Sequence, residues 1–274
     1  MTDQADRYDR IGVGYARWWA PVLRPAVMEL LDRVAPLVGG GERILDIGTG
    51  TGQLALEALD RWPGVSVVGV DASSGMRDLA EAEADRRLAA ADRDRFTTRV
   101  AFADTLPFEA GAFDLALSSF VFQLVPNRAR ALREARRILP IGGLLAYVTW
   151  MPGGERFAAD DVYDSLLEEL DLEPRGDGGP SGDVASPERA IGELRRAGFA
   201  DAWAEAGSLA HRFTAEGYFG FLTEFDEATF FEELDGRDRA ELSSELRRRL
   251  GRLTASDLTM RFPIVFATGR RSRR

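Results

Sequence analysis

Short runs of apolar residues alternate with longer stretches of helical spacing from residue 43 onward. The apolar runs predict strands at residues 43–47, 65–70, 98–103, 113–118 and 144–149. The stretches between them predict helices at 53–61, 74–91 and 128–139, the last stopped by Pro140 and the glycines behind it. Alternation of this kind is typical of a parallel sheet flanked by helices. We therefore predict a doubly wound α/β fold.

The pattern continues differently on either side of this core. Two further strands are predicted at residues 200–206 and 261–268, and Ser186, Pro187 and Glu188 form a helix start before the first of them. Residues 214–254 between these strands have helical spacing, which indicates a helical insertion before the last strand of a mostly parallel seven-stranded sheet. Residues 1–40 show no β pattern and predict a helical cap, with a helix over about 25–38. Residues 173–182 are rich in Gly and Pro and predict a loop.

Length and composition narrow the function classes. At 274 residues, 45% of them hydrophobic, the chain fits one large domain, which we divide into the cap, a core at 41–150 and substrate-side elements at 151–274. No run of about 18 apolar residues occurs, so we expect a protein of the cytoplasm with no membrane partner. The chain has no Cys or Lys and one His, which argues against thiolate or multi-histidine metal sites and Schiff-base chemistry. The net charge of −10 disfavours a nucleic-acid partner.

A glycine-rich turn carries the strongest chemical signal. The first predicted strand runs into Asp46-Ile-Gly-Thr-Gly-Thr-Gly52 and then into a helix. Ligands bind at such turns, in the crevice beyond the carboxyl ends of the strands. Residues 50–55 also fit the dinucleotide pattern G-x-G-x-x-A, so a nicotinamide-dependent oxidoreductase stays open on this motif alone.

Three carboxylates on the same rim favour a different ligand. Asp46 lies two residues before the first glycine, where it would repel a pyrophosphate but attract an ammonium or a sulfonium. Asp71 ends the second predicted strand, where a carboxylate accepts hydrogen bonds from ribose hydroxyls. Asp104 follows the third strand and can accept a hydrogen bond from an adenine amino group. The pattern predicts a cationic nucleoside ligand.

With these residues in place, the sequence resembles the class I S-adenosylmethionine-dependent methyltransferases. The likeness is greatest to their small-molecule branch, which includes the ubiquinone and menaquinone biosynthesis enzymes. It rests on the segments at residues 44–52, 69–76, 103–108, 113–119 and 133–143, and beyond residue 149 only 194–199 and the closing strand resemble the family. The resemblance implies a Rossmann-like fold and methyl transfer from S-adenosylmethionine, leaving S-adenosylhomocysteine.

The resemblance also implies a set of cofactor contacts. Asp46 and the glycines would contact the methionine portion, and Asp71 the ribose. Met76 and Leu106 would contact the faces of adenine, and Asp104 with Thr105 its edge. Ser118 and Ser119 would lie near the transferred methyl. The full implied set is Asp46, Gly48, Thr49, Gly50, Gly52, Asp71, Ala72, Met76, Asp104, Thr105, Leu106, Ser118 and Ser119.

The sequence defines the residues that contact the methyl acceptor less well than those that contact the cofactor. His211 is the one side chain that ordinarily titrates near neutrality, so it is the candidate general base if the acceptor is a hydroxyl. Tyr15, Trp18, Gln123 and Tyr218 are candidate substrate contacts, although each of them can equally serve packing or face solvent. We expect a small, partly apolar acceptor, such as a natural-product or quinone-type intermediate. The acceptor atom and the oligomeric state stay open, and so does a regulatory module that binds the cofactor without turnover.

Overall fold

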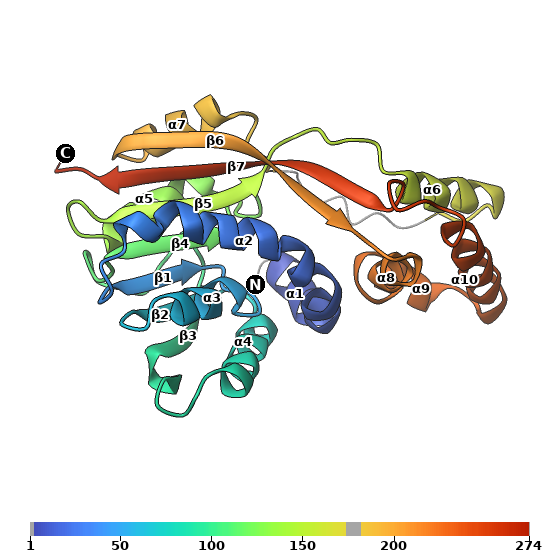
Figure 1. The fold of residues 1–274 in the computed structure, drawn as a ribbon, viewed down its shortest axis with the longest axis horizontal. Coiled ribbons are helices and arrows are strands. Elements are labelled where there is room, and N and C mark those ends of the chain that lie inside the picture. Colours follow the sequence, from blue (N-terminus) through green and yellow to red (C-terminus); the bar gives the residue numbers. More distant parts are fainter. Residues whose placement is uncertain (1–2, 174–181, 274) are drawn as a thin grey trace.

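The computed structural model describes residues 3–173 and 182–273, so most of the predicted Gly/Pro-rich loop lies outside the described residues. Figure 1 shows a single twisted sheet with helices on both faces. Its strands are β1 (Arg43–Ile47), β2 (Ser66–Asp71), β3 (Phe96–Val100), β4 (Leu115–Ser119), β5 (Leu144–Trp150), β6 (Phe199–Arg212) and β7 (Thr259–Arg271). They lie in the order β3-β2-β1-β4-β5-β7-β6, and only β7 runs antiparallel to its neighbours. The predicted mostly parallel seven-stranded sheet is confirmed.

Each central strand is buried on both faces because helices cover both sides of the sheet. The first face packs against α2 (Ala20–Val34), α3 (Gln53–Arg61) and α4 (Ser74–Arg87), and the second against α5 (Arg128–Ile138) and α7 (Pro187–Arg196). Ile44 of β1 faces the first cluster and Leu45 faces the second, as strand alternation requires. The predicted bounds of β1 and α3 are confirmed to the residue.

The start and end of β3 and the end of α4 differ from the prediction. Strand β3 covers 96–100 and not 98–103, because Phe96 is the fully buried anchor and the chain leaves the sheet after Val100. Helix α4 ends at residue 87 and not 91, and a short 3₁₀ turn (Arg93–Arg95) leads into β3. The consequence for the site is that residues 101–105 form a loop beside the end of β2.

The N-terminal cap is more helical than the sequence pattern predicts. It contains α1 (Asp3–Gly14), a π-helical turn (Tyr15–Trp19), α2 and a 3₁₀ turn (Ala35–Leu37). The predicted helix over 25–38 is therefore displaced, because α2 starts at residue 20 and Pro25 lies inside it. The turn of α2 before Pro25 is held by the burial of Val22 and Leu23 in the hydrophobic cluster that covers this face of the sheet.

The β6–β7 hairpin carries the helical insertion away from the sheet. Figure 1 shows both strands running past the others to a group of helices at one end of the molecule. These are α8 (Ala215–Phe221), a π-helical turn (Leu222–Asp226), α9 (Ala228–Glu233) and α10 (Gly236–Leu250), as predicted, together with α6 (Ala158–Glu169), which the prediction omits. In the described part of the chain, no helix has the length and apolar character needed to cross a membrane.

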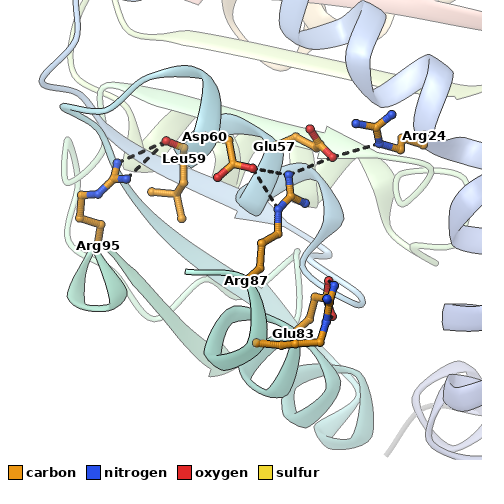
Figure 2. Close-up of polar contacts among 8 residues, drawn as sticks. Arg24, Glu57, Leu59, Asp60, Glu83, Arg87 and Arg95 are labelled. Carbon is orange, nitrogen blue, oxygen red and sulfur yellow. Dashed lines mark hydrogen bonds and ion pairs between the residues drawn. The ribbon is translucent and has the colours of Figure 1, made fainter. Parts of the chain in front are cut away.

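A buried carboxylate connects three helices on the first face of the sheet. Glu57 of α3 is 7% exposed and accepts a hydrogen bond of 3.0 Å from Arg24 of α2. Arg87 of α4 lies 3.2 Å from the same oxygen and also pairs with Asp60 (Figure 2). Because α3 begins directly at the glycine-rich turn, this network fixes the helix that follows the turn.

We predict that Glu57→Gln lowers the free energy of unfolding by about 1–3 kcal/mol, because two guanidinium groups lose a charged hydrogen-bond acceptor in a buried position. Chemical denaturation followed by circular dichroism measures this loss. The control is Glu83→Gln on α4, whose partner Arg86 is 72% exposed; its loss should stay below about 1 kcal/mol. Equal losses in the two variants would show that the network adds nothing to ordinary surface pairing.

Candidate functional site

A cavity of about 350 Å³ lies where β1, β2 and β4 reach their carboxyl ends. The glycine-rich turn, the start of α4, the loop after β3 and the chain after β4 form its walls, and α1 covers it. Its lining comprises Gln4, Ala5, Tyr8, Tyr15, Gly48, Gly50, Asp71, Ala72, Ser73, Met76, Ala101, Phe102, Ala103, Asp104, Ser119, Phe120, Val121, Leu124, Val125 and Pro126. Of the predicted cofactor residues, the cavity brings together Gly48, Gly50, Asp71, Ala72, Met76, Asp104 and Ser119.

Two glycines of the turn are required by its geometry. Gly48 has φ +73°, and a Cβ there would lie 2.2 Å from the Val121 side chain, so no larger residue fits against the chain after β4. Gly50 has φ +53° and a Cβ there would meet no atom within 4 Å, because the position opens onto the cavity. The backbone at Gly50 is thus free for a ligand to approach closely.

Asp46 is buried at the end of β1 with one oxygen unused. The carboxylate is 1% exposed, and its Oδ2 accepts a hydrogen bond of 2.8 Å from the Thr49 hydroxyl. Its Oδ1 has no hydrogen-bond partner among the described residues. Burial, with a smaller contribution from the charge of Asp71, raises the pKa of Asp46 to about 7, against the opposing effect of hydrogen bonding from Thr49 and from the Ala55 backbone. An unpartnered buried carboxylate oxygen is a ready acceptor for a cationic donor.

Asp71 organises the loop around the cavity. Its Oδ2 accepts a hydrogen bond from the backbone N–H of Gly50 at 2.8 Å, and its Oδ1 accepts one from Ser73 at 2.9 Å. Burial raises the pKa of Asp71, while these backbone donors act in the opposite direction. Each carboxylate oxygen has a further lone pair. Asp71 can therefore hold the turn and still accept hydrogen bonds from a diol.

Four predicted cofactor residues lie outside the cavity lining, in addition to Asp46 and Thr49 just beneath it. Ser118 is fully buried and donates to the carbonyl of Ile47, because adjacent strand residues point to opposite faces and only Ser119 can face the cavity. Leu106 is 4% exposed and packs in the second hydrophobic cluster. Ser118 and Leu106 therefore do not line the cavity, whereas the resemblance implies that Ser118 lies near the methyl group and Leu106 near the adenine ring.

The other two predicted cofactor residues outside the cavity lining, Gly52 and Thr105, have roles in the backbone conformation. Gly52 caps α3 with φ +81°, and a Cβ there would lie 3.3 Å from Ala80 of α4. Its role in the structure is to let the two helices approach each other. Thr105 is exposed and closes a turn by donating its N–H to the carbonyl of Phe102. Phe102 itself lines the cavity, although the sequence analysis does not select it.

Tyr15 is the one predicted substrate residue that lines the cavity. Its ring lies 5.9 Å from Tyr8 and 5.8 Å from Phe225 of the insertion, both in edge-to-face geometry. Burial raises the pKa of both tyrosines. Tyr8 also lines the cavity and is missed by the sequence analysis. The signal was the seven-residue spacing of the two tyrosines, which places them two helical turns apart on one face.

Trp18 packs between the cap and the insertion, and Tyr218 packs between the insertion and α6. The Trp18 indole donates a hydrogen bond of 2.8 Å to Glu224, and a Cβ at Gly220 of α8 would lie 2.3 Å from the indole ring. Tyr218 is 1% exposed, and its hydroxyl donates to Asp160 of α6. The two side chains therefore lie between helices, outside the lining of the cavity.

Gln123 and His211 also lie outside the cavity. Gln123 is 7% exposed and uses both ends of its amide, donating to the carbonyl of Phe120 at 2.6 Å and accepting from Thr149 at 2.5 Å. His211 does not follow the sixth strand as predicted, because β6 continues to residue 212 and pairs His211 with Met260. Partial burial lowers the pKa of His211.

Comparison with known proteins finds a family match over most of the chain segments that line the cavity. Residues 45–147 match the methyltransferase domain family. The chain is 34% identical over 157 residues to malonyl-[acyl-carrier protein] O-methyltransferase of Geobacter sulfurreducens, a match that covers 57% of this chain and 55% of that protein. It is 30% identical over 164 residues to demethylmenaquinone methyltransferase of Thermotoga maritima, covering 60% and 66% respectively. The chain thus spans only a little more than half to about two thirds of these curated relatives.

The fold is also shared with solved structures. A phosphoethanolamine N-methyltransferase 2 of Haemonchus contortus, in complex with phosphomonomethylethanolamine and S-adenosylhomocysteine, superposes with a TM-score of 0.60 at 19% identity, covering 100% of this chain and 61% of that chain. At that identity the match concerns the fold alone. The predicted resemblance to the class I methyltransferases is confirmed.

The raised pKa of Asp46 predicts a pH-dependent stability. A carboxyl group with a pKa of about 7 in the folded protein and about 4 in the unfolded chain favours folding while it is protonated. This contribution is complete below pH 4, falls as the pH rises, and is lost above pH 7. Relative to wild type, Asp46→Asn should therefore gain up to about 1.4 kcal/mol per pH unit between pH 5 and pH 7. Denaturation curves at each pH measure the difference.

Thr49→Val provides the matched variant. It keeps the side-chain shape but removes the donor that favours the charged carboxylate, so the decline in stability should extend to higher pH than in wild type. A constant difference between wild type and Asp46→Asn from pH 4 to pH 8 would show that Asp46 titrates as it does in water.

Proposed function

Because residues 45–147 of this chain match the methyltransferase domain family, we propose that the protein is an S-adenosylmethionine-dependent methyltransferase acting on a small molecule. One observation carries the proposal. Asp71 lines the cavity, and on the neighbouring strand the buried Asp46, two residues before the lining residue Gly48, has a carboxylate oxygen with no partner among the described residues. A nucleoside that also bears an ammonium group and a sulfonium matches this pair, whereas a dinucleotide pyrophosphate would be repelled by it.

The residues present fit this cofactor. Asp46 Oδ1 would accept a hydrogen bond from the ammonium group, and the open backbone at Gly50 would receive the methionine portion. Asp71 would hold the ribose hydroxyls, while Met76 and Phe102 border the cavity where an apolar base can lie and Asp104 offers an acceptor to its amino group. The bound cofactor supplies an electrophilic methyl group, and the protein supplies none of that reactivity.

The remaining task of the chain is to orient the acceptor and exclude water. In-line displacement requires nucleophile and methyl group to lie about 3–3.5 Å apart. Tyr8, Tyr15 and Phe120 enclose one side of the cavity with aromatic surface, and Ser119 offers a hydroxyl at the end of β4. This surface supports a partly apolar acceptor, such as a natural-product or quinone-type intermediate. Both the single-domain organisation and a cytoplasmic location stay predictions from the sequence.

The position of His211 does not support the role of general base. Its imidazole packs edge-to-face on Phe213 with ring centroids 4.5 Å apart, in the part of the hairpin that leads to the insertion. We propose instead that the acceptor enters with its nucleophile already deprotonated, or loses its proton to water, as methyl transfer itself needs no base.

Calorimetric titration with S-adenosylhomocysteine tests the cofactor assignment. Wild type should bind it at micromolar concentration and should not bind NADH. Asp71→Ala should bind at least tenfold more weakly, equivalent to about 1.4 kcal/mol, because the ribose loses its acceptor. Asp78→Ala makes the same chemical change at an exposed position of α4 and should leave the affinity unchanged. Binding of NADH in place of S-adenosylhomocysteine would overturn the proposal.

His211→Ala tests the absence of a histidine base. We expect the rate of S-adenosylhomocysteine formation with any accepted substrate to stay within twofold of wild type, because the ring lies outside the cavity lining. The pH profile of the rate should also be unchanged. A tenfold loss, with S-adenosylhomocysteine affinity intact, would restore the assignment made from the sequence.

A further inference from the structure

A second recess lies directly behind the cofactor cavity. It encloses about 420 Å³ between the first half of α5 and one side of α7. Val125 and Pro126, in the segment that links β4 to α5, line both the recess and the cavity, so a two-residue stretch of chain separates them. We call this recess the arginine groove.

The charge of the arginine groove is opposite to that of the whole protein. Four arginines, Arg128, Arg133, Arg189 and Arg196, line it together with one acid, Glu193. The chain as a whole carries a net charge of −10. The excess of three positive charges in this one groove therefore contrasts with the negative charge of the protein as a whole.

Two of the four guanidinium groups are already used within the protein. Glu193 lies 2.9 Å from Arg128 and 3.0 Å from Arg189, and its side chain is 11% exposed. Arg128 also donates to the carbonyl of Gly182. In contrast, Arg133 of α5 and Arg196 of α7 make no hydrogen bond or ion pair with any described residue, and both are exposed. Two guanidinium groups of the groove, one from α5 and one from α7, thus have no partner in the part of the chain that the structure describes.

The floor of the groove is apolar. Val125, Leu132 and Ala197 contribute hydrocarbon surface beneath the arginines, and Leu132 is 1% exposed. A fully hydrated inorganic anion gains nothing from such a floor, whereas an anion on a hydrocarbon arm buries that arm against it. Guanidinium groups bind phosphate and carboxylate oxygens through paired hydrogen bonds.

We propose that the arginine groove binds an oxyanion, a phosphate or a carboxylate, carried on a short apolar arm. Arg133 and Arg196 bind the anion, and the apolar floor receives the arm. Because the groove shares Val125 and Pro126 with the cofactor cavity, a molecule anchored here lies one chain segment from the site of methyl transfer. The proposal goes beyond the proposed function and does not depend on it.

Calorimetric titration of the full chain with butyl phosphate and, separately, with inorganic phosphate tests the groove. Butyl phosphate should bind at least tenfold more tightly than inorganic phosphate, and pentanoate in a parallel titration distinguishes phosphate from carboxylate preference. In the double variant Arg133→Gln/Arg196→Gln the affinity for butyl phosphate should fall at least tenfold. Arg130→Gln, an exposed arginine of α5 outside the groove, is the matched control and should bind as wild type does.

The proposal is overturned if wild type binds neither organic anion, if inorganic phosphate binds as tightly as butyl phosphate, or if Arg130→Gln loses as much affinity as the double variant. The last result would indicate a general charge effect. Titration of the same variants with S-adenosylhomocysteine separates the two proposals. Intact cofactor binding with no anion binding refutes only the groove, and the reverse result refutes only the cofactor assignment.

Discussion

The structure depends on two carboxylates that end neighbouring parallel strands inside the protein. The register of β1 and β2 pairs Asp46 with Gly69, which places Asp71 just beyond the same edge of the sheet. Burial raises the pKa of both carboxyl groups, and the charge of Asp71 adds to the rise at Asp46. In the glycine-rich turn, the backbone N–H of Gly50 donates a hydrogen bond to Asp71. Asp46 keeps one oxygen with no partner among the described residues. Under the proposed function, the ammonium group of the cofactor would bind this unpartnered oxygen.

The cover of the cavity is built from parts that are far apart in the sequence. Asp9 of α1 accepts hydrogen bonds from the Ser73 hydroxyl and the Gly75 N–H, which ties the cap to the start of α4. On its other side the cap meets the insertion so closely that a Cβ at Gly14 would lie 2.0 Å from the carbonyl oxygen of Glu224. The long β6–β7 hairpin is needed because it carries the insertion across to the cap. The cover is therefore one continuous packed unit made from both ends of the chain.

The features that could be predicted from the sequence are those set by residues close together in the chain. The turn at residues 46–52, the acids at the ends of β1 and β2 and the bounds of α3 follow from adjacent residues and strand periodicity. It missed α6, although Ala159, Tyr163 and Leu166 have helical spacing, and it placed His211 after a strand that continues past it. Ser118 and Gln123 were misjudged for a different reason: the hydrogen bonds that turn them inward go to carbonyls and hydroxyls brought near only by the folded sheet.

Proton release on ligand binding tests the central claim most directly. Burial raises the pKa of Asp46 to about 7, so the carboxyl group is partly protonated near neutral pH, and an ammonium group placed against its free oxygen would favour the ionised form. Calorimetric titration with S-adenosylhomocysteine in two buffers of different ionisation enthalpy should show a net release of protons on binding near pH 7. Asp46→Asn should release none. Binding without proton release in the wild type would contradict the account, because the ammonium group would then lie elsewhere.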